Sequence, residues 1–201
     1  MKRFLTTKSY APTHILKIAI IVLLSFSGIG ILGGGFLLRE SMSNANEVKK
    51  ITDTSRYQEI RDQLWSKKEQ IKHFPHQITT DVKDTRLVYS QGFLQGGSFF
   101  QLRVKQPPEK IQKILSEYRK IAKHKYMGGD TNDHVNQPNG VPTTFFYTSD
   151  SGEESFPASY EILVLDAQDR GSLGFKWNHG DSYGVAINSS ISEIVYWAEE
   201  W

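Results

Sequence analysis

Two histidines, His73 and His76, stand three residues apart and are the first residues to consider for metal or acid–base chemistry. Two ligands do not make a zinc site, which needs three or four that converge on one point. His124 and His134 could complete such a site only if the fold brought them close to this pair. We therefore interpret His73 and His76 as polar residues at the end of a helix, and we expect neither a metal nor a cofactor.

A second candidate is the segment 130–134, where oxygen-bearing side chains alternate as they do in a calcium-binding loop. An EF-hand loop also requires a glycine at its sixth position and a glutamate at its twelfth. Val135 and Val141 occupy these positions, so the EF-hand is excluded. A weaker calcium site of another kind stays open, and a solvated loop rich in asparagine and aspartate explains the same residues.

Candidates for catalysis are few. Ser98 follows two glycines but lacks the trailing glycine of a G-x-S-x-G nucleophile elbow, and it begins a predicted strand. Glu153 and Glu154 are adjacent on a predicted loop, which is typical of solvating charge. No H-E-x-x-H motif or phosphate-binding loop occurs. Members of a catalytic triad can be far apart in sequence, but the absence of any motif favours a protein that is not an enzyme.

One apolar run, from Ile18 to Leu38, indicates where the chain works. It contains 21 residues and no charge, which is the length that crosses a bilayer as a helix. Four basic residues and no acidic ones precede it, and such a flank stays in the cytoplasm. The sequence therefore predicts a single-pass membrane protein with its N-terminus in the cytoplasm.

The predicted organisation has four parts: a cytoplasmic basic tail (1–17), a transmembrane helix (18–38), a linker (39–54) and an extracytoplasmic domain (55–201). A cleavable signal peptide is the alternative, with small residues at 43–45 as the cleavage site. The apolar core of a signal peptide is usually about 7–15 residues long, so the longer run here favours an uncleaved anchor. The domain is exported in both cases.

Gly30 and Gly34 lie within the apolar run at the Gly-x-x-x-Gly spacing that lets two membrane helices approach closely. This spacing predicts a homodimer through that face. The alternative is the ordinary composition of a membrane helix, in which glycine is common.

Charge and cysteine content exclude several classes of function. The chain has a formal charge of +2 and its first 17 residues contribute +4, so the remainder carries about −2. A mildly acidic domain has no electrostatic reason to bind nucleic acid, which requires neutralisation of phosphates. The chain has no cysteine, which excludes disulfides, a cysteine nucleophile and a lipid-modified cysteine anchor.

The pattern after the linker predicts an α+β domain in which an antiparallel sheet has two helices packed on one face. The first helix begins with the capping pattern Ser55-x-x-Gln58, covers 55–72 and is stopped by Pro75. The second covers 108–125, and a loop covers 128–140. Predicted strands are 85–90, 98–105, 143–148, 159–166, 173–178 and 182–188. The last segment, 191–201, has features of helix and of strand, and its Ile-Val-Tyr-Trp run favours strand.

The turn between the first two predicted strands is the best candidate contact surface. Gln91, Phe93, Leu94 and Gln95 lie in this glycine-rich turn and give it an apolar tip. A tight turn folded over the sheet explains the same residues, whereas an exposed apolar tip is typical of an interaction site. We expect these four residues to bind a partner.

The chain resembles uncharacterised single-anchor membrane proteins of cyanobacteria. The resemblance covers about 56–201 and is carried by His73-Phe74-Pro75, by the run from Gly92 to Gly97, and by the run from Phe100 to Arg103. It implies a bacterial plasma or thylakoid membrane, and it implies no catalytic or ligand-binding residue.

Two functions follow as hypotheses. The first is a membrane-anchored extracytoplasmic interaction module that contacts the bilayer and a membrane or periplasmic protein, and does not bind nucleic acid. The alternative is a small-ligand-binding or hydrolytic domain with a cleft between helix 108–125 and the sheet. Four aromatic residues would line that cleft: Tyr118, Tyr147, Tyr160 and Trp177.

Overall fold

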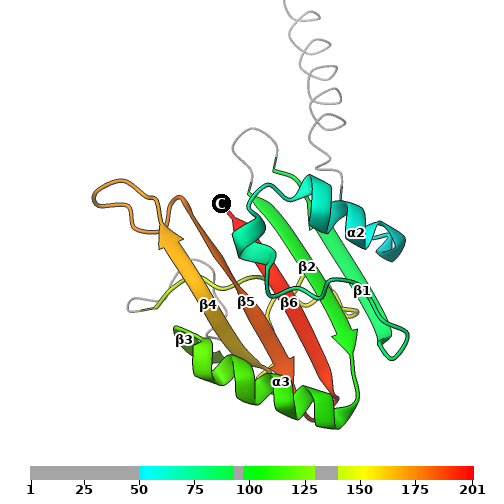
Figure 1. Ribbon diagram of the computed structural model, residues 1–201. Coiled ribbons are helices and arrows are strands. Elements are labelled where there is room, and N and C mark those ends of the chain that lie inside the picture. Colours follow the sequence, from blue (N-terminus) through cyan, green and yellow to red (C-terminus); the bar gives the residue numbers. More distant parts are fainter. Residues whose placement is uncertain (1–49, 93–96, 130–139) are drawn as a thin grey trace, which may run out of the picture. The chain divides into compact units, whose positions relative to one another are not determined.

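A sheet of six antiparallel strands forms the centre of the domain (Figure 1). The computed structural model describes residues 50–92, 97–129 and 140–201, which belong to one compact unit, Val48–Trp201. The predicted cytoplasmic tail, the apolar run with Gly30 and Gly34, and most of the linker lie outside the described residues. Among the residues that are described, no helix is long and apolar enough to cross a membrane.

The strand order in the sheet is β1-β2-β6-β5-β4-β3, and every neighbouring pair is antiparallel. The bounds of the strands are β1 Lys83–Ser90, β2 Ser98–Lys105, β3 His124–Met127, β4 Glu161–Asp169, β5 Gly180–Asn188 and β6 Glu193–Glu200. This confirms the α+β class, the antiparallel sheet and the first hairpin. The last segment is a strand, as its composition favours, and β6 lies between β2 and β5.

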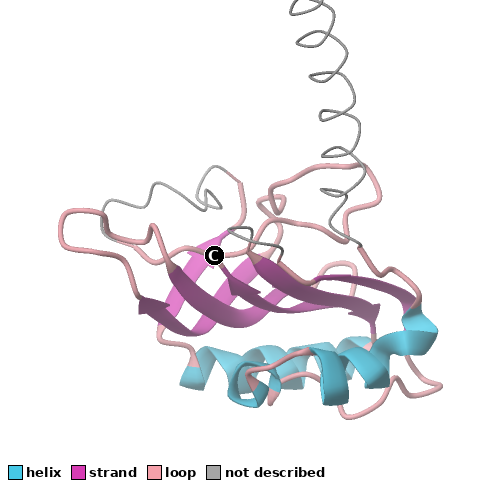
Figure 2. Cartoon of the chain, turned by 90° about the horizontal axis from the view of Figure 1, so that it is seen from above, coloured by secondary structure: helices cyan, strands magenta, loops and turns pink. Residues whose placement is uncertain are grey.

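Helical segments cover one face of this sheet, as Figure 2 shows. The main one is α3, Pro108–Ile121, and a set of short turns precedes β1: η1 Thr54–Arg56, α2 Tyr57–Glu59, η2 Ile60–Leu64 and η3 Lys68–Ile71. We call the side that they cover the helical face. The predicted placement of the helices on one face is therefore correct.

The predicted continuous helix over 55–72 is wrong. The chain leaves helical geometry at Trp65, whose ψ is 121°, because its indole is buried against Tyr89 and Phe100 and donates to the side chain of Gln70. The N-terminal cap also differs from the predicted Ser55. The carboxylate of Asp53 caps the first turn by accepting from the backbone N–H of Ser55.

The second helix begins at Pro108 as predicted but ends at Ile121 instead of Lys125. Ala122 is already extended, and the next backbone N–H, that of Lys123, donates to the carbonyl of Val164 in β4. Pairing with β4 therefore converts the end of the predicted helix into β3, a strand that the periodicity did not predict.

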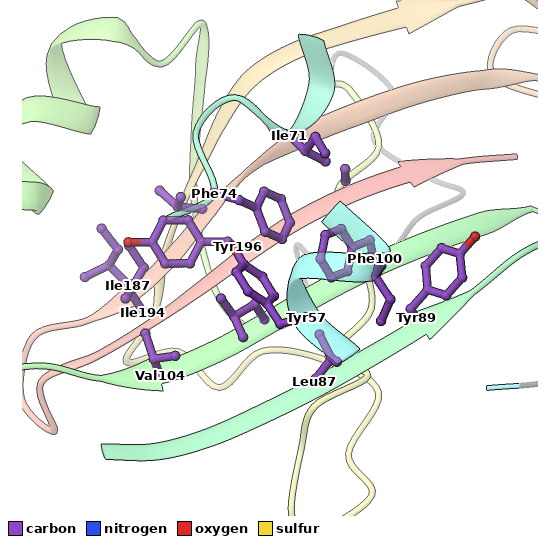
Figure 3. Packing of buried hydrophobic residues seen from close by; sticks show 14 of the residues in the cluster. Tyr57, Ile71, Phe74, Leu87, Tyr89, Phe100, Val104, Ile187, Ile194 and Tyr196 are labelled. Atoms are coloured by element: carbon purple, nitrogen blue, oxygen red, sulfur yellow. The ribbon is translucent and has the colours of Figure 1, made fainter. Parts of the chain in front are cut away.

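The largest hydrophobic cluster lies between the sheet and the helical segments (Figure 3). Phe100 of β2 is at its centre, with ring contacts to Phe74, Tyr57 and Tyr89. Ile111 and Leu115 of α3 are buried in the same cluster. Burial of this apolar surface is the main stabilising contribution of the face.

The opposite side of the sheet, which we call the loop-covered face, is also buried. Phe146, Phe156 and Tyr160 pack there against side chains of β4, β5 and β6. The predicted strand 143–148 is wrong, because this segment lies over the sheet without joining a ladder. The backbone of this segment is bonded by a side chain instead of by a neighbouring strand. The side chain of Gln101 accepts from the backbone N–H of Thr148 and donates to the carbonyl of residue 145.

Candidate interaction surface at one end of the sheet

One end of the sheet gathers the features that could bind a partner. β1, β4 and β6 finish at this end and β2 and β5 begin there, as the pairs Ser98↔Glu200 and Asp169↔Gly180 show (Figure 1). We call it the loop end. The chain also enters the domain here, since the backbone of Ile51 exchanges two hydrogen bonds of 2.8 and 2.9 Å with Tyr89.

The predicted contact turn joins β1 to β2 at the loop end. Gln91 is exposed, and the backbone N–H of Gly92 donates to the hydroxyl of Ser98 at 2.9 Å. A side chain at Gly97 would approach the carbonyl oxygen of Glu200 within 2.3 Å, so the close passage of the turn beside β6 requires glycine. Phe93, Leu94 and Gln95 lie outside the described residues.

The connection between β4 and β5, Arg170 to His179, is the other projection at the loop end, and we call it the β4–β5 loop. The predicted strand 173–178 within it is wrong. Leu173 is fully exposed and Phe175 is 66% exposed, although both residue types favour strands. The reason is local hydrogen bonding, because the carboxylate of Asp169 accepts from the backbone N–H groups of Gly171 and Trp177.

The base of the β4–β5 loop is fixed to the domain. Asp181 is buried and pairs with Arg170 at 2.7 Å and with Lys67 at 3.5 Å. The indole N–H of Trp201 donates to the carbonyl of Trp177 at 2.8 Å, which joins the loop to the last residue of the chain. The loop therefore presents Leu173 and Phe175 on a defined backbone.

A polar cluster on the loop-covered face has a structural role. Arg103 and Glu193 are buried with their side chains 3.8 Å apart, and the hydroxyl of Tyr160 donates to Glu193. Arg103 also pairs with Asp150 at 2.5 Å, and Arg86 joins the same carboxylate at 3.1 Å. Hydrogen bonds from Arg103 and then Arg86 hold the pKa of Asp150 below its usual range. Arg103 is buried because residues 143–150 cover this face of the sheet.

The two predicted histidines do not form a site. The Nε2 of His73 lies 2.9 Å from the carbonyl of Gly184, and its ring stacks on Tyr183. His76 is exposed and contacts Arg61. In the part of the chain that the structure describes, no three His, Asp or Glu residues are grouped as metal ligands. His134, like most of the proposed calcium loop, lies outside the described residues.

Burial lowers the pKa of His73 to about 4, against the opposing effect of the Gly184 carbonyl. The Nδ1 atom is buried, and backbone hydrogen bonds to Gly184 and Trp197 offset only part of the cost of burying the protonated ring.

This lowered pKa makes the stability of the domain depend on pH. Between about pH 6.5 and pH 4 the unfolded chain binds the proton and the folded chain does not, so stability falls as the pH falls. We expect a loss of about 2 kcal/mol between pH 7 and pH 5 from this residue, measured by urea unfolding. His73→Gln should remove that part of the pH dependence. His76→Gln, which changes an exposed histidine, should leave it unchanged, and an equal effect of the two variants would contradict the assignment.

The four residues of the alternative cleft are not brought together. Tyr118 lies on the helical face, where its hydroxyl donates to the carbonyl of His73. Tyr147 and Tyr160 lie on the loop-covered face, and Trp177 is in the β4–β5 loop. The interface of α3 with the sheet is filled by apolar side chains.

The described surface has several open hollows. One of about 610 Å³ is lined by residues 52–54, 85–88 and 147–150. Another of about 350 Å³ is lined by aromatic residues 145–147 and by Glu153 and Glu154. The carboxylates of this pair are exposed, as the sequence predicts.

Comparison of the chain with protein-family models, with characterised proteins and with solved structures gave no match. The geometry of the domain is therefore the basis of the functional proposal.

Proposed function

We propose that this chain is a single-pass membrane protein whose domain acts outside the cytoplasm as an interaction module, without catalysis. The observation that carries the proposal is the loop end of the sheet. There Ile51 pairs with β1, Gln91 is exposed, and Leu173 and Phe175 project on a fixed loop.

The distribution of apolar surface supports a binding role. Both faces of the sheet are covered, so the exposed Leu173 and Phe175 are not remnants of an incomplete core. Exposed apolar groups on a supported loop are typical of contact sites. The bilayer would keep the domain close to partners in the same membrane, which raises their effective concentration.

The proposed protein partner is a membrane or periplasmic protein that binds at Gln91, Phe93, Leu94 and Gln95. The location of Gln91 at the loop end supports this assignment, because a partner in the membrane can reach it. A homodimer through Gly30 and Gly34 is part of the same proposal and would place two such surfaces side by side in one assembly.

The proposal is tested by partner recovery. The full chain is crosslinked mildly in native membranes, extracted in detergent and analysed by mass spectrometry. We expect Phe93→Ser with Leu94→Ser to lose the recovered partner while the unfolding midpoint stays unchanged. The matched control is Ile191→Ser, which changes an exposed apolar residue between β5 and β6 at the other end of the sheet. Unchanged recovery from the double variant would remove the assignment of this turn.

A further inference from the structure

The β4–β5 loop combines exposed apolar side chains with basic ones. Leu173 and Phe175 flank Gly174, whose φ of 89° makes the turn that separates them. Lys176 is exposed beside them, and no acidic residue occurs from position 170 to position 180. Asp169 and Asp181 flank this segment, but Asp169 accepts backbone N–H groups of the loop and Asp181 pairs with Arg170. Exposed apolar side chains beside a lysine are typical of surfaces that lie in the headgroup region of anionic membranes.

The support of this loop indicates a role beyond connection. Trp177 holds a left-handed backbone conformation with φ of 59°, which a bulky residue rarely adopts. Asp169 accepts from the backbone N–H of Trp177, and the indole of Trp201 donates to its carbonyl, so the peptide groups before and after Trp177 are both held. Leu173 and Phe175 are therefore exposed on a backbone that cannot easily turn them inward.

The position of the β4–β5 loop relative to Ile51 indicates that the loop contacts the bilayer. Ile51 pairs with Tyr89 at the loop end, and the β4–β5 loop projects from the same end (Figure 1). Residues 39–49 separate the apolar run from the first described residue, and eleven residues span at most about 40 Å. Ile51 pairs with the outer edge of β1, so five strand spacings of about 4.8 Å separate it from β4, which is about 24 Å across the sheet.

We propose that the β4–β5 loop is a second membrane contact, in which Leu173 and Phe175 enter the headgroup region of the bilayer and Lys176 faces anionic phosphates. This inference rests on the proposed membrane anchor. Arg170 contributes less, because it already pairs with Asp181. Within the domain, Ile51 lies at one edge of the sheet and the β4–β5 loop lies across it, and the turn at Gln91 is between them.

The test uses the absence of cysteine from the chain, which permits single-site labelling without other changes. The full chain carries one cysteine, Leu173→Cys, Phe175→Cys or the control Ile191→Cys, with a nitroxide label. It is reconstituted in nanodiscs of phosphatidylcholine and phosphatidylglycerol. The collision rate of the nitroxide with oxygen, which concentrates in lipid, is divided by its collision rate with a water-soluble nickel chelate, and this quotient is the oxygen-to-nickel ratio.

We expect the oxygen-to-nickel ratio at positions 173 and 175 to exceed that at 191 by at least about fivefold. Lys176→Glu should lower the ratio at 173 in these discs, and discs of phosphatidylcholine alone should give a smaller ratio than anionic discs.

Three results would overturn the inference, and they separate it from the proposed anchor. A label at 173 that is as accessible to nickel as the one at 191, in a chain that co-migrates with the discs, removes the loop contact and leaves the anchor. Protection from both reagents means that protein covers the loop. A chain that does not co-migrate with the discs contradicts the anchor and this inference together.

Discussion

Arg103→Ala is expected to lower the free energy of unfolding by about 3–5 kcal/mol, because it breaks a buried ion pair from one side. The side chain of Arg103 is 5% exposed and that of its partner Glu193 is 3% exposed. Removing the guanidinium leaves the carboxylate of Glu193 in the interior without its ion-pair partner, although the hydroxyl of Tyr160 still donates to it. An unpaired buried charge is among the most destabilising single changes that a fold can suffer.

The chain offers a matched control for this prediction. Arg86 binds the same carboxylate, that of Asp150, but its side chain is 55% exposed. Arg86→Ala should therefore cost no more than about 1 kcal/mol, since exposed ion pairs contribute little. Adding Glu193→Gln to Arg103→Ala should restore part of the loss, because the charge that was left unpaired is removed. Urea unfolding measures all four proteins. Equal effects of the two arginine variants would contradict the assigned difference in burial.

Phe100→Ala is expected to cost about 3–5 kcal/mol, the range for removal of a buried aromatic side chain. The ring of Phe100 is fully buried and stacks on Phe74 with centroids 4.6 Å apart (Figure 3). The rings of Tyr57 and Trp65, from the segment that precedes β1, have their centroids 6.0 and 6.1 Å from the centroid of Phe100. The substitution therefore removes the residue that joins β2 to the helical segments, and it leaves a cavity that they cannot fill without moving.

The same change at an exposed phenylalanine tests whether burial is the cause. Phe175→Ala, in the β4–β5 loop, should change the free energy of unfolding by no more than about 0.5 kcal/mol. A large loss at Phe175, or a small one at Phe100, would contradict the structure at these positions. Thermal unfolding followed by near-ultraviolet circular dichroism reports on the aromatic packing directly.

Parts of the fold that depend on short-range pattern could be predicted. The hairpin of β1 and β2 follows from two strand-favouring runs around a glycine-rich turn. The start of α3 follows from Pro108 and the amphipathic run after it. The last strand follows from the Ile-Val-Tyr-Trp run, which is buried on both sides.

Parts of the fold that depend on contacts with residues distant in sequence could not be predicted. The break at Trp65 occurs because its indole finds a buried place against Tyr89, which no local pattern encodes. β3 exists because β4 offers a free edge beside the end of α3. Arg103 and Gln101 are polar strand residues that become interior only because residues 143–150, distant in sequence, cover them.

Of the two parts of the candidate surface, the sequence indicates the turn at Gln91 but not the β4–β5 loop. The turn at Gln91 was identified because glycine and apolar residues occur together between two strands. Leu173 and Phe175 were missed, because leucine and phenylalanine in a short run predict a strand whatever their exposure. The available signal was the pair of turn sequences beside them, at 169–171 and 178–181, which leaves a segment of six residues with a glycine in it.

The central claim, that the loop end of the sheet binds a protein at the membrane, is tested most directly by a photoreactive residue at Gln91. The full chain is expressed in its native cells, with the photoreactive residue at Gln91 or, as control, at Ile191. Irradiation should give discrete protein adducts from position 91 and none from position 191. Adducts from neither position, or the same adducts from both, would contradict the claim.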